Sequence, residues 1–263
     1  MTRAVQRAID LLAVLRTAPG PMSLSELAIA TSLDNATALR LLRDLVSRDL
    51  VSYNRERRSY VLGRGVLELA GGLRNEQSLI RATLPILEGL HRRTGGRVAL
   101  SFRVGLHHVV GVELQQKYPV SLFHGVGVSA PLNAGAVGKA ILAFSLPEVL
   151  DELCARPLAR VAPNTIVDPD VLRTEVAEVA ERGFALSEHE VSDAVAVAAP
   201  LMSEDGYADG AVRVALDGGA LSDVEGEAQL LTSAAQLLSE LRTTHENVQP
   251  DALMATLERR SEQ

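Results

Sequence analysis

Two short helices separated by a tight turn constrain the fold of this chain more than any other feature. In the stretch SLSELAIATSLDNATALRLLRDL, residues 23–45, Ser23 stands three residues before Glu26, which is the spacing of a capping box at a helix start. That helix is predicted to end near Ala30, because TSLD supplies turn-forming residues, and Asp34 is predicted to cap a second helix. The second helix has an apolar stripe, Ala38, Leu41, Leu42, Leu45 and Val46, and a more exposed face that includes Asn35, Thr37, Arg40, Asp44 and Arg48. The pattern predicts a helix-turn-helix.

A supporting helix and a hairpin flank this pair. RAIDLLAVL has helical spacing and ends at the PGP of residues 19–21. Its expected apolar face consists of Ala8, Ile9, Leu12 and Leu15. After the pair, LVSYN and SYVLG flank RERR, which predicts a β-hairpin with Val51, Tyr53, Tyr60 and Leu62 facing the core. The tip arginines, Arg55, Arg57 and Arg58, are long enough to reach phosphates or a narrow minor groove, so the hairpin is either a DNA-binding wing or a solvated turn.

Charge is distributed unevenly along the chain. Residues 1–64 hold ten arginines and six acidic residues, a net charge of +4, although the whole chain carries -7. The remainder therefore carries -11. A basic segment joined to an acidic body is what a nucleic-acid-binding domain attached to a non-binding domain would show, because neutralising phosphates requires local positive potential.

The chain is long enough for two domains and has no secretory or membrane pattern. Its 263 residues exceed the usual size of a single domain. No run of about 18 uncharged apolar residues is present, and Asp10 falls where a signal peptide needs its apolar stretch, so a cytoplasmic protein is expected. Cys154 is the only cysteine, which excludes an internal disulfide and a cysteine-rich zinc site, and we interpret it as a small buried thiol.

The rest of the chain mixes helical and strand patterns. GVLELAGGLRNEQSLIRATLPILEGLHRRTGG has helical spacing, weakened at Gly71 and Gly72, and is predicted to be a connector. Strand alternation follows in RVALSFRV, HHVVGVEL, YPVSLF, AVAVAAPL and GAVRVALDG, with the helical segments AGAVGKAILAFS, PEVLDELCAR and DPDVLRTEVAEVAERG between them. This order, with connected antiparallel strands, predicts an α+β domain.

Two stretches imitate nucleotide-binding motifs without meeting their requirements. GVGVSA is followed by Pro131, so no helix begins inside it as the dinucleotide fingerprint requires. NAGAVGKA has Asn133 where a P-loop needs glycine, and Ala140 where it needs a hydroxyl. Asn133 is instead predicted to cap a helix that begins near Gly135, whose first amides are able to bind a small anion. Alternatively, these small residues only allow close helix-to-sheet packing.

The quoted residues resemble one known family. RAIDLLAVL, SLSELAIATSLDNATALRLLRDLVSRDLV and YVLG resemble the winged helix-turn-helix of the IclR family of bacterial transcriptional regulators, and the resemblance continues through TGGRVALS, APLNAGAVGKAILA, ERGFALSEHE and VAVAAPL. It implies a winged helix-turn-helix DNA-binding domain over 1–64, a linker helix over 65–82, an effector-binding domain with a GAF-like fold over 83–245 and a tail over 246–263. It also implies a homodimer or homotetramer that binds double-stranded promoter DNA and a small-molecule effector.

The resemblance also implies site residues. Thr37 and Arg40 match the family's pattern and are expected to contact DNA, whereas Asn35 and Ala36 stand where the family often has Lys and Ser. The Asn35 amide suits a bidentate contact to adenine, or else a local hydrogen bond beside Asp34. The expected effector-binding residues are Ala136, Val137, Ser187, Ala196, Ala215 and Asp217. Asp217 is either a pocket carboxylate or an outward residue of the LDGG turn. A pocket carboxylate would repel an anionic effector and would indicate a cationic, amino-containing or neutral one.

Catalysis is the rival class of function. The chain has no G-x-S-x-G, H-E-x-x-H or C-x-x-C motif. His107 and His108 are neighbours in a strand pattern and are predicted to point to opposite faces. Glu188, His189 and Glu190 are interpreted as a solvated loop rather than as metal ligands. We therefore expect no catalytic residue, no metal site and no cofactor.

The function expected from the sequence is that of a ligand-responsive DNA-binding transcriptional regulator. It is expected to bind a pseudo-palindromic promoter site and to respond to a small metabolite, such as an organic acid or a related catabolic intermediate. The alternatives are a DNA-binding protein without an effector and, less favoured, a small-molecule-processing enzyme.

Overall fold

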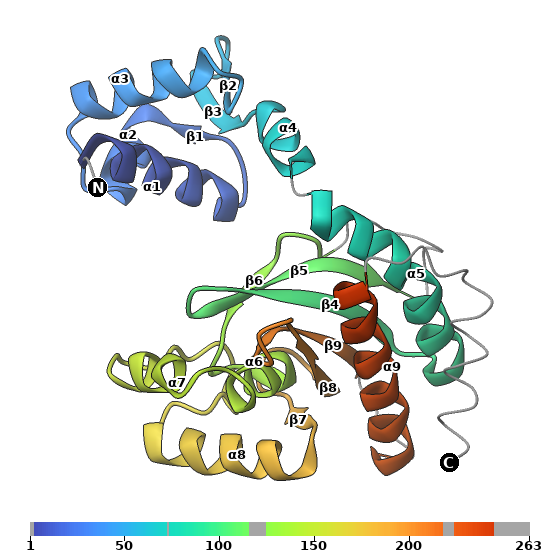
Figure 1. The fold of residues 1–263 in the computed structure, drawn as a ribbon. Coiled ribbons are helices and arrows are strands. Elements are labelled where there is room, and N and C mark those ends of the chain that lie inside the picture. The colour runs from blue at the N-terminus through green and yellow to red at the C-terminus, as the bar shows by residue number, and fades with distance from the viewer. Residues whose placement is uncertain (1–2, 73, 116–124, 218–223, 245–263) are drawn as a thin grey trace. The chain divides into compact units, whose positions relative to one another are not determined.

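The computed structural model describes residues 3–72, 74–115, 125–217 and 224–244, and Figure 1 shows their helices and strands. The chain divides into two compact units, Met1–Gln77 and Ser78–Gln263. Among the helices in the described ranges, none combines the length and the apolar character needed to cross a membrane. The strand pattern YPVSLF and the tail expected over 246–263 lie outside the described residues.

The first unit is a helix-turn-helix followed by a hairpin. Its helices are α1 (Arg3–Thr17), α2 (Leu24–Ala30), α3 (Asn35–Val46) and α4 (Gly65–Gly71), and its strands are β1 (Met22–Ser23), β2 (Val51–Asn54) and β3 (Ser59–Leu62). The strands form an antiparallel sheet in the order β1-β3-β2. Leu11, Leu27 and Leu42, one from each of the first three helices, are fully buried together. The predicted winged helix-turn-helix is confirmed.

Local hydrogen bonds set the bounds of α2 and α3 as the sequence predicts. The Ser23 amide donates to the Glu26 carboxylate at 2.7 Å, and the Ser23 hydroxyl accepts from the Glu26 amide at 3.3 Å, which completes the capping box. The contact with the Ser23 amide lowers the pKa of the Glu26 carboxyl. α2 ends at Ala30, and Asp34 caps α3.

The buried face of α1 agrees with the predicted one at Ala8, Leu12 and Leu15, which belong to the core or pack against it, but not at Ile9. Leu11 and Leu15 are buried, whereas Ile9 is 51% exposed. Because an α-helix turns about 100° per residue, Ile9 and Leu11 point in nearly opposite directions. Leu11 therefore faces α2 and α3, which contact α1, whereas Ile9 points away from them.

The region expected to hold the linker helix contains parts of two helices. α4 ends at Gly71, and α5 begins at Arg74 and continues to Thr94. Consecutive glycines at 71 and 72 favour a helix end, because glycine loses more backbone freedom in a helix than any other residue. α5 then continues through Pro85. The linker role stays a prediction.

In the described residues of the second unit, six strands form an antiparallel sheet with helices on both faces. The strand order is β6-β5-β4-β9-β8-β7. The strands are β4 (Arg97–Val104), β5 (His107–Leu114), β6 (Ser129–Pro131), β7 (Ala185–Glu188), β8 (Ala194–Met202) and β9 (Ala208–Asp217). α5 and α9 (Val224–Thr244) cover one face, and α6 (Gly135–Ala143), α7 (Pro147–Cys154) and α8 (Pro169–Arg182) lie on the other (Figure 1). This confirms the α+β class and agrees with a GAF-like fold.

Strand alternation gives the two faces of this sheet different side chains. In β8 and β9, the larger residues Val197, Leu201, Val212 and Val214 pack toward α5 and α9. The alternate positions, Ala196, Ala198, Ala211 and Ala215, pack toward α6. Successive side chains of a strand point to opposite faces. The face toward α6 therefore carries these alanines, whose small side chains leave room for a cavity.

Cys154 is less buried than the sequence analysis expected. It ends α7 as a free, half-buried thiol, and its partial burial raises its pKa. Its neighbour Leu153 is the buried residue of this helix. A helix places adjacent residues about 100° apart, so Leu153 lies in the core while Cys154 packs against its edge.

Candidate functional site

Helix α3 presents the residues that the sequence assigns to DNA contact. Asn35 and Arg40 are exposed and Thr37 is partly exposed. The opposite side of the helix is buried as predicted: Ala38, Leu41, Leu42 and Leu45. The first turn is held by the Asp34 carboxylate, which accepts from the Thr37 amide at 2.8 Å. This hydrogen bond lowers the pKa of Asp34 and keeps a negative charge at the positive end of the helix.

The Asn35 side chain is available for a contact outside the chain. It makes no hydrogen bond within the described part of the structure, whereas Asp34 provides the cap. This disagrees with the alternative of a local hydrogen bond for Asn35. Contact of Asn35, Thr37 or Arg40 with DNA stays a prediction.

The tip of the β2–β3 hairpin carries the three predicted arginines on its surface. Arg55, Arg57 and Arg58 are all exposed. The Asn54 side chain accepts from the Arg57 amide at 2.9 Å, and Arg58 has a φ of +48°. An asparagine that bonds the backbone of its own turn is a common way to stabilise a tight turn. The turn thus holds three cations at one end of the hairpin.

One hairpin residue is less buried than predicted. Tyr53 was expected to face the core but is 41% exposed, whereas Tyr60 is buried. The two rings lie 4.7 Å apart, and their backbones pair directly across the strands. Tyr60 therefore fills the core position, and Tyr53 packs over it from the solvent side.

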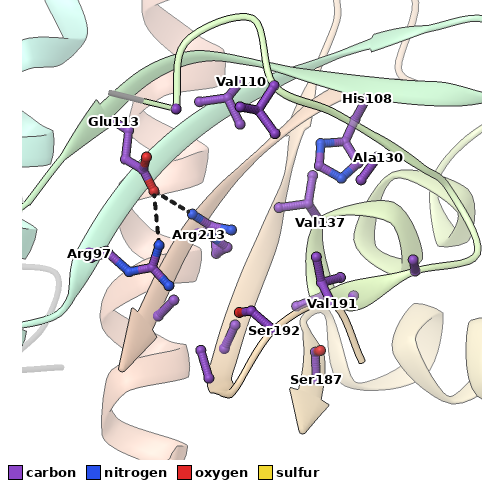
Figure 2. Close-up of a pocket in the computed structure, with 18 of the residues that line it drawn as sticks. Arg97, His108, Val110, Glu113, Ala130, Val137, Ser187, Val191, Ser192 and Arg213 are labelled. Atoms are coloured by element: carbon purple, nitrogen blue, oxygen red, sulfur yellow. Dashed lines mark hydrogen bonds and ion pairs between the residues drawn. The ribbon is translucent and has the colours of Figure 1, made fainter. Parts of the chain in front are cut away.

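A cavity of about 340 Å³ lies in the second unit, between the alanine-lined sheet face and the start of α6. Figure 2 shows the side chains that line it. The lining includes five of the predicted effector-binding residues: Ala136, Val137, Ser187, Ala196 and Ala215. Asp217 pairs with Ala194 at the end of β9, and its side chain lies outside the described residues. Residues far apart in the sequence therefore meet around one cavity, although their role in effector binding stays a prediction.

The start of α6 is not capped by Asn133, so that prediction was wrong. The cap position is Ala134, and the Asn133 side chain donates to the carbonyls of Ala159 and Ile166, both at 2.8 Å. These bonds tie buried Asn133 to the segment that precedes α8. The amide of Gly135 instead donates to the Glu190 carboxylate at 3.2 Å.

Glu190 belongs to a network of ion pairs beside the cavity. Its carboxylate lies 2.6 Å from the Lys139 ammonium, which also pairs with Glu175 at 3.1 Å. Glu175 in turn pairs with Arg182 at 3.1 Å. Of the solvated loop predicted for residues 188–190, the exposure is correct for Glu188 and His189, but Glu188 ends strand β7 and Glu190 is buried. A buried carboxylate needs a partner, and the partner, Lys139, is on a different element.

A second charged group lines the cavity itself and was missed in the sequence analysis. The Glu113 carboxylate lies 2.9 Å from the Arg213 guanidinium and 3.6 Å from the Arg97 guanidinium (Figure 2). It also accepts from the Gln115 side chain at 3.2 Å. Arg213 stands among apolar residues in VRVALD, and this break in the strand pattern was a usable signal. The sequence could not show that its partner comes from another strand.

His108 lies in the cavity wall and was also missed as a site residue. It is 6% exposed, whereas His107 is exposed, so their predicted opposite orientation is confirmed. Burial, with smaller contributions from the charges of Arg213 and His107, lowers the pKa of His108 to about 4. The ring is therefore neutral at pH 7.

Lowering the pH should destabilise the protein through His108. Its pKa is about 4 in the folded chain and about 6.5 in an unfolded chain, so the unfolded state binds a proton first as pH falls. The free energy of unfolding should therefore decrease between about pH 6.5 and pH 4, by about 2 kcal/mol at pH 5. Urea unfolding at pH 7 and pH 5 measures this in wild type and His108→Phe. An equal loss in both proteins would assign the acid sensitivity to other groups.

A basic, winged helix-turn-helix unit joined to an α+β unit with a ligand-sized cavity defines a ligand-responsive DNA-binding regulator. The family described as "Bacterial transcriptional regulator IclR C-terminal" matches residues 73–246, and the "IclR helix-turn-helix domain" matches residues 4–55. The chain belongs to the IclR family of bacterial transcriptional regulators.

Individual relatives agree with this assignment. The chain is 29% identical to the probable transcriptional regulator SauR of Cupriavidus necator over 214 residues, which cover 80% of this chain and 84% of SauR. It superposes with a TM-score of 0.78 on the crystal structure of a putative IclR regulator from Silicibacter, which is 28% identical, over 91% of this chain and 96% of the other. An IclR homologue from Microbacterium hydrocarbonoxydans, solved with 4-hydroxybenzoate, shares the fold at a TM-score of 0.75 and 24% identity, over 92% of this chain and all of that one.

Proposed function

We propose that this regulator is a cytoplasmic homodimer or homotetramer that binds a pseudo-palindromic promoter site through α3 and the β2–β3 tip. An organic acid bound in the cavity of the second unit changes the spacing or orientation of the DNA-binding units. One observation carries the proposal: the residues assigned to DNA lie on an exposed helix face and hairpin tip, while five assigned to the effector line one cavity.

The DNA-binding part of the proposal rests on exposure and charge. Arg40 on α3 and the three arginines of the hairpin tip are exposed in a segment with a net charge of +4. A helix of this kind fits the major groove, where its side chains read base edges, while a hairpin beside it contacts phosphates. In a symmetric dimer, two such helices fall in successive major grooves, which requires a pseudo-palindromic site.

The organic-acid part rests on the lining of the cavity. Two cationic side chains, Arg97 and Arg213, and a single carboxylate between them, that of Glu113, stand in an otherwise mostly apolar wall, so cations outnumber anions there. Ligand cavities of this kind bury an apolar body and orient it through a few polar groups. Cations at one side of such a wall favour a ligand that carries a carboxylate. The proposal gives the cavity a binding role and not a catalytic one.

Filling the cavity tests the effector site. Ala196 lies on the cavity floor, so the ring of Ala196→Phe should occupy the ligand's space. The variant should still bind a duplex selected by the protein from a random-sequence library. The acid concentration that changes this binding should rise by about tenfold or more, since the ligand loses room. Fluorescence anisotropy of the labelled duplex, titrated with short aliphatic, 2-oxo and aromatic monocarboxylates, including 4-hydroxybenzoate, measures both.

Ala180→Phe provides the matched control, because Ala180 is exposed on α8. It should respond to the acids as wild type does. A response that is unchanged in Ala196→Phe would remove the cavity from the mechanism. If no acid changes DNA binding by wild type, the proposal that the effector is an organic acid is wrong. The same titration still tests DNA binding itself.

A further inference from the structure

Besides the hydroxyls of Ser187 and Ser192, the cavity has two polar regions with different chemistry. One is charged and consists of Glu113 with the guanidinium groups of Arg97 and Arg213. The other is neutral: His108 projects from β5 beside Ala130 and faces Val137, away from the charged group (Figure 2). The remaining wall is largely made of small apolar side chains: Val110, Val128, Ala134, Val191, Ala194 and Ala196. A ligand that fills the cavity therefore meets a charged region and a neutral hydrogen-bonding ring.

The His108 ring has a hydrogen-bonding need that the described protein does not meet. The side chain is 6% exposed, and its Nδ1 atom is buried without a hydrogen-bond partner among the described residues. Buried polar atoms in native proteins are nearly always paired, and leaving one unpaired is costly. A 180° flip of an imidazole exchanges the places of its nitrogens and carbons, so either nitrogen can be turned toward the cavity in the same space.

The state of the ring limits the partner it can take. His108 is neutral at pH 7, because its pKa is lowered to about 4 by burial. A neutral imidazole offers one donor and one acceptor. These suit a hydroxyl or a carbonyl, whereas a carboxylate gains more from the charged hydrogen bonds of arginine.

We propose that the effector also carries a neutral hydroxyl or carbonyl group, and that His108 forms a hydrogen bond with this group. This bond sets the specificity of the cavity among organic acids. The inference rests on the proposed function, in which the cavity binds an organic acid. The carboxylate of the effector lies near Arg97 and Arg213, and its apolar body lies against the valines and alanines between. An acid that lacks the neutral group leaves the buried ring unpaired and binds more weakly. A site built to hydrogen-bond a ligand group rejects the analogue without it more strongly than an apolar pocket rejects a missing methylene.

Paired acids with and without a hydroxyl test this proposal. Isothermal titration calorimetry of the full chain compares benzoate with 3- and 4-hydroxybenzoate, and hexanoate with 6-hydroxyhexanoate. In wild type, the hydroxylated member of at least one set should bind about tenfold more tightly, as expected for one buried hydrogen bond. His108→Phe should reduce this preference to less than about twofold, because a phenyl ring in the same place has no nitrogen to hydrogen-bond the hydroxyl.

Two further variants separate a specific role from a structural one. His108→Gln keeps a donor and an acceptor and should keep part of the preference. His107→Phe is the matched control, since His107 is the exposed neighbour on the opposite face of β5, and it should keep all of it. Thermal unfolding of each variant shows whether it is folded at the temperature of the titration.

The outcomes distinguish failure of this inference from failure of the proposed function on which it rests. A preference for hydroxylated acids that survives in His108→Phe, or acids that bind wild type with no preference in any set, would overturn the role of His108 alone. If no acid binds wild type, both the inference and the proposed effector class fail, while binding to the selected duplex remains as separate evidence for the DNA-binding function.

Discussion

Replacing Lys139 by methionine should lower the free energy of unfolding by about 3–5 kcal/mol, because the substitution leaves a buried carboxylate without its cation. Lys139 and Glu190 are both buried, and their charged atoms lie 2.6 Å apart. Glu175, the second partner of Lys139, keeps its ion pair with Arg182, so the loss falls mainly on Glu190. Urea unfolding of the full chain at pH 7, followed by circular dichroism, measures the change.

Two variants make this prediction specific. The double variant Lys139→Met/Glu190→Gln should recover part of the loss, because it removes the unpaired charge as well. Arg156→Met breaks the exposed ion pair with Glu152 and should cost less than about 1 kcal/mol, as exposed pairs do. A loss below about 1 kcal/mol in Lys139→Met would show that solvent reaches Glu190 and that the network contributes little to stability.

Arg40→Ala should produce the largest loss of DNA affinity among single substitutions on α3. Arg40 is exposed on the helix proposed to read the major groove. A good arginine contact to a base contributes about 1–3 kcal/mol to the binding free energy of each half-site. This corresponds to a loss of roughly 5- to 150-fold per half-site. Titration of the selected duplex at fixed salt measures the loss, and calorimetry with the acid panel should show effector binding unchanged.

The salt dependence of the same titration separates the roles of the arginines. A base contact is lost mainly on the selected duplex, whereas loss of a phosphate contact, as expected for Arg57→Ala at the hairpin tip, weakens selected and random duplexes alike and reduces the salt slope. Arg156→Ala removes the same charge from an exposed position in the second unit and should leave affinity unchanged. If Arg40→Ala and wild type bind the selected duplex with equal affinity, the proposal that α3 reads the bases of the DNA site is wrong.

Features that depend on neighbouring residues could be predicted from the sequence. The capping box of Ser23 and Glu26 and the Asp34 cap appear where they were expected, because each is closed by groups three residues apart. The buried stripe of α3 and the two faces of β8 also follow from local periodicity. The resemblance to IclR regulators added the positions that line the cavity, which no local pattern contains.

By itself, the sequence determined most of the helices and strands, although not β6, β7 or α9. It also determined the caps that bound α2 and α3 and the separation of a basic unit from an acidic one, since these depend on residues close together in the chain. Only the tertiary structure decided that Ile9 on α1 stays exposed, that Asn133 bonds the segment before α8, and that Glu190 reaches Lys139. It also brought Glu113 to Arg213, one hundred positions away. The reason is physical: a buried polar or charged side chain must find a partner, and which partner lies within reach depends on how distant elements pack.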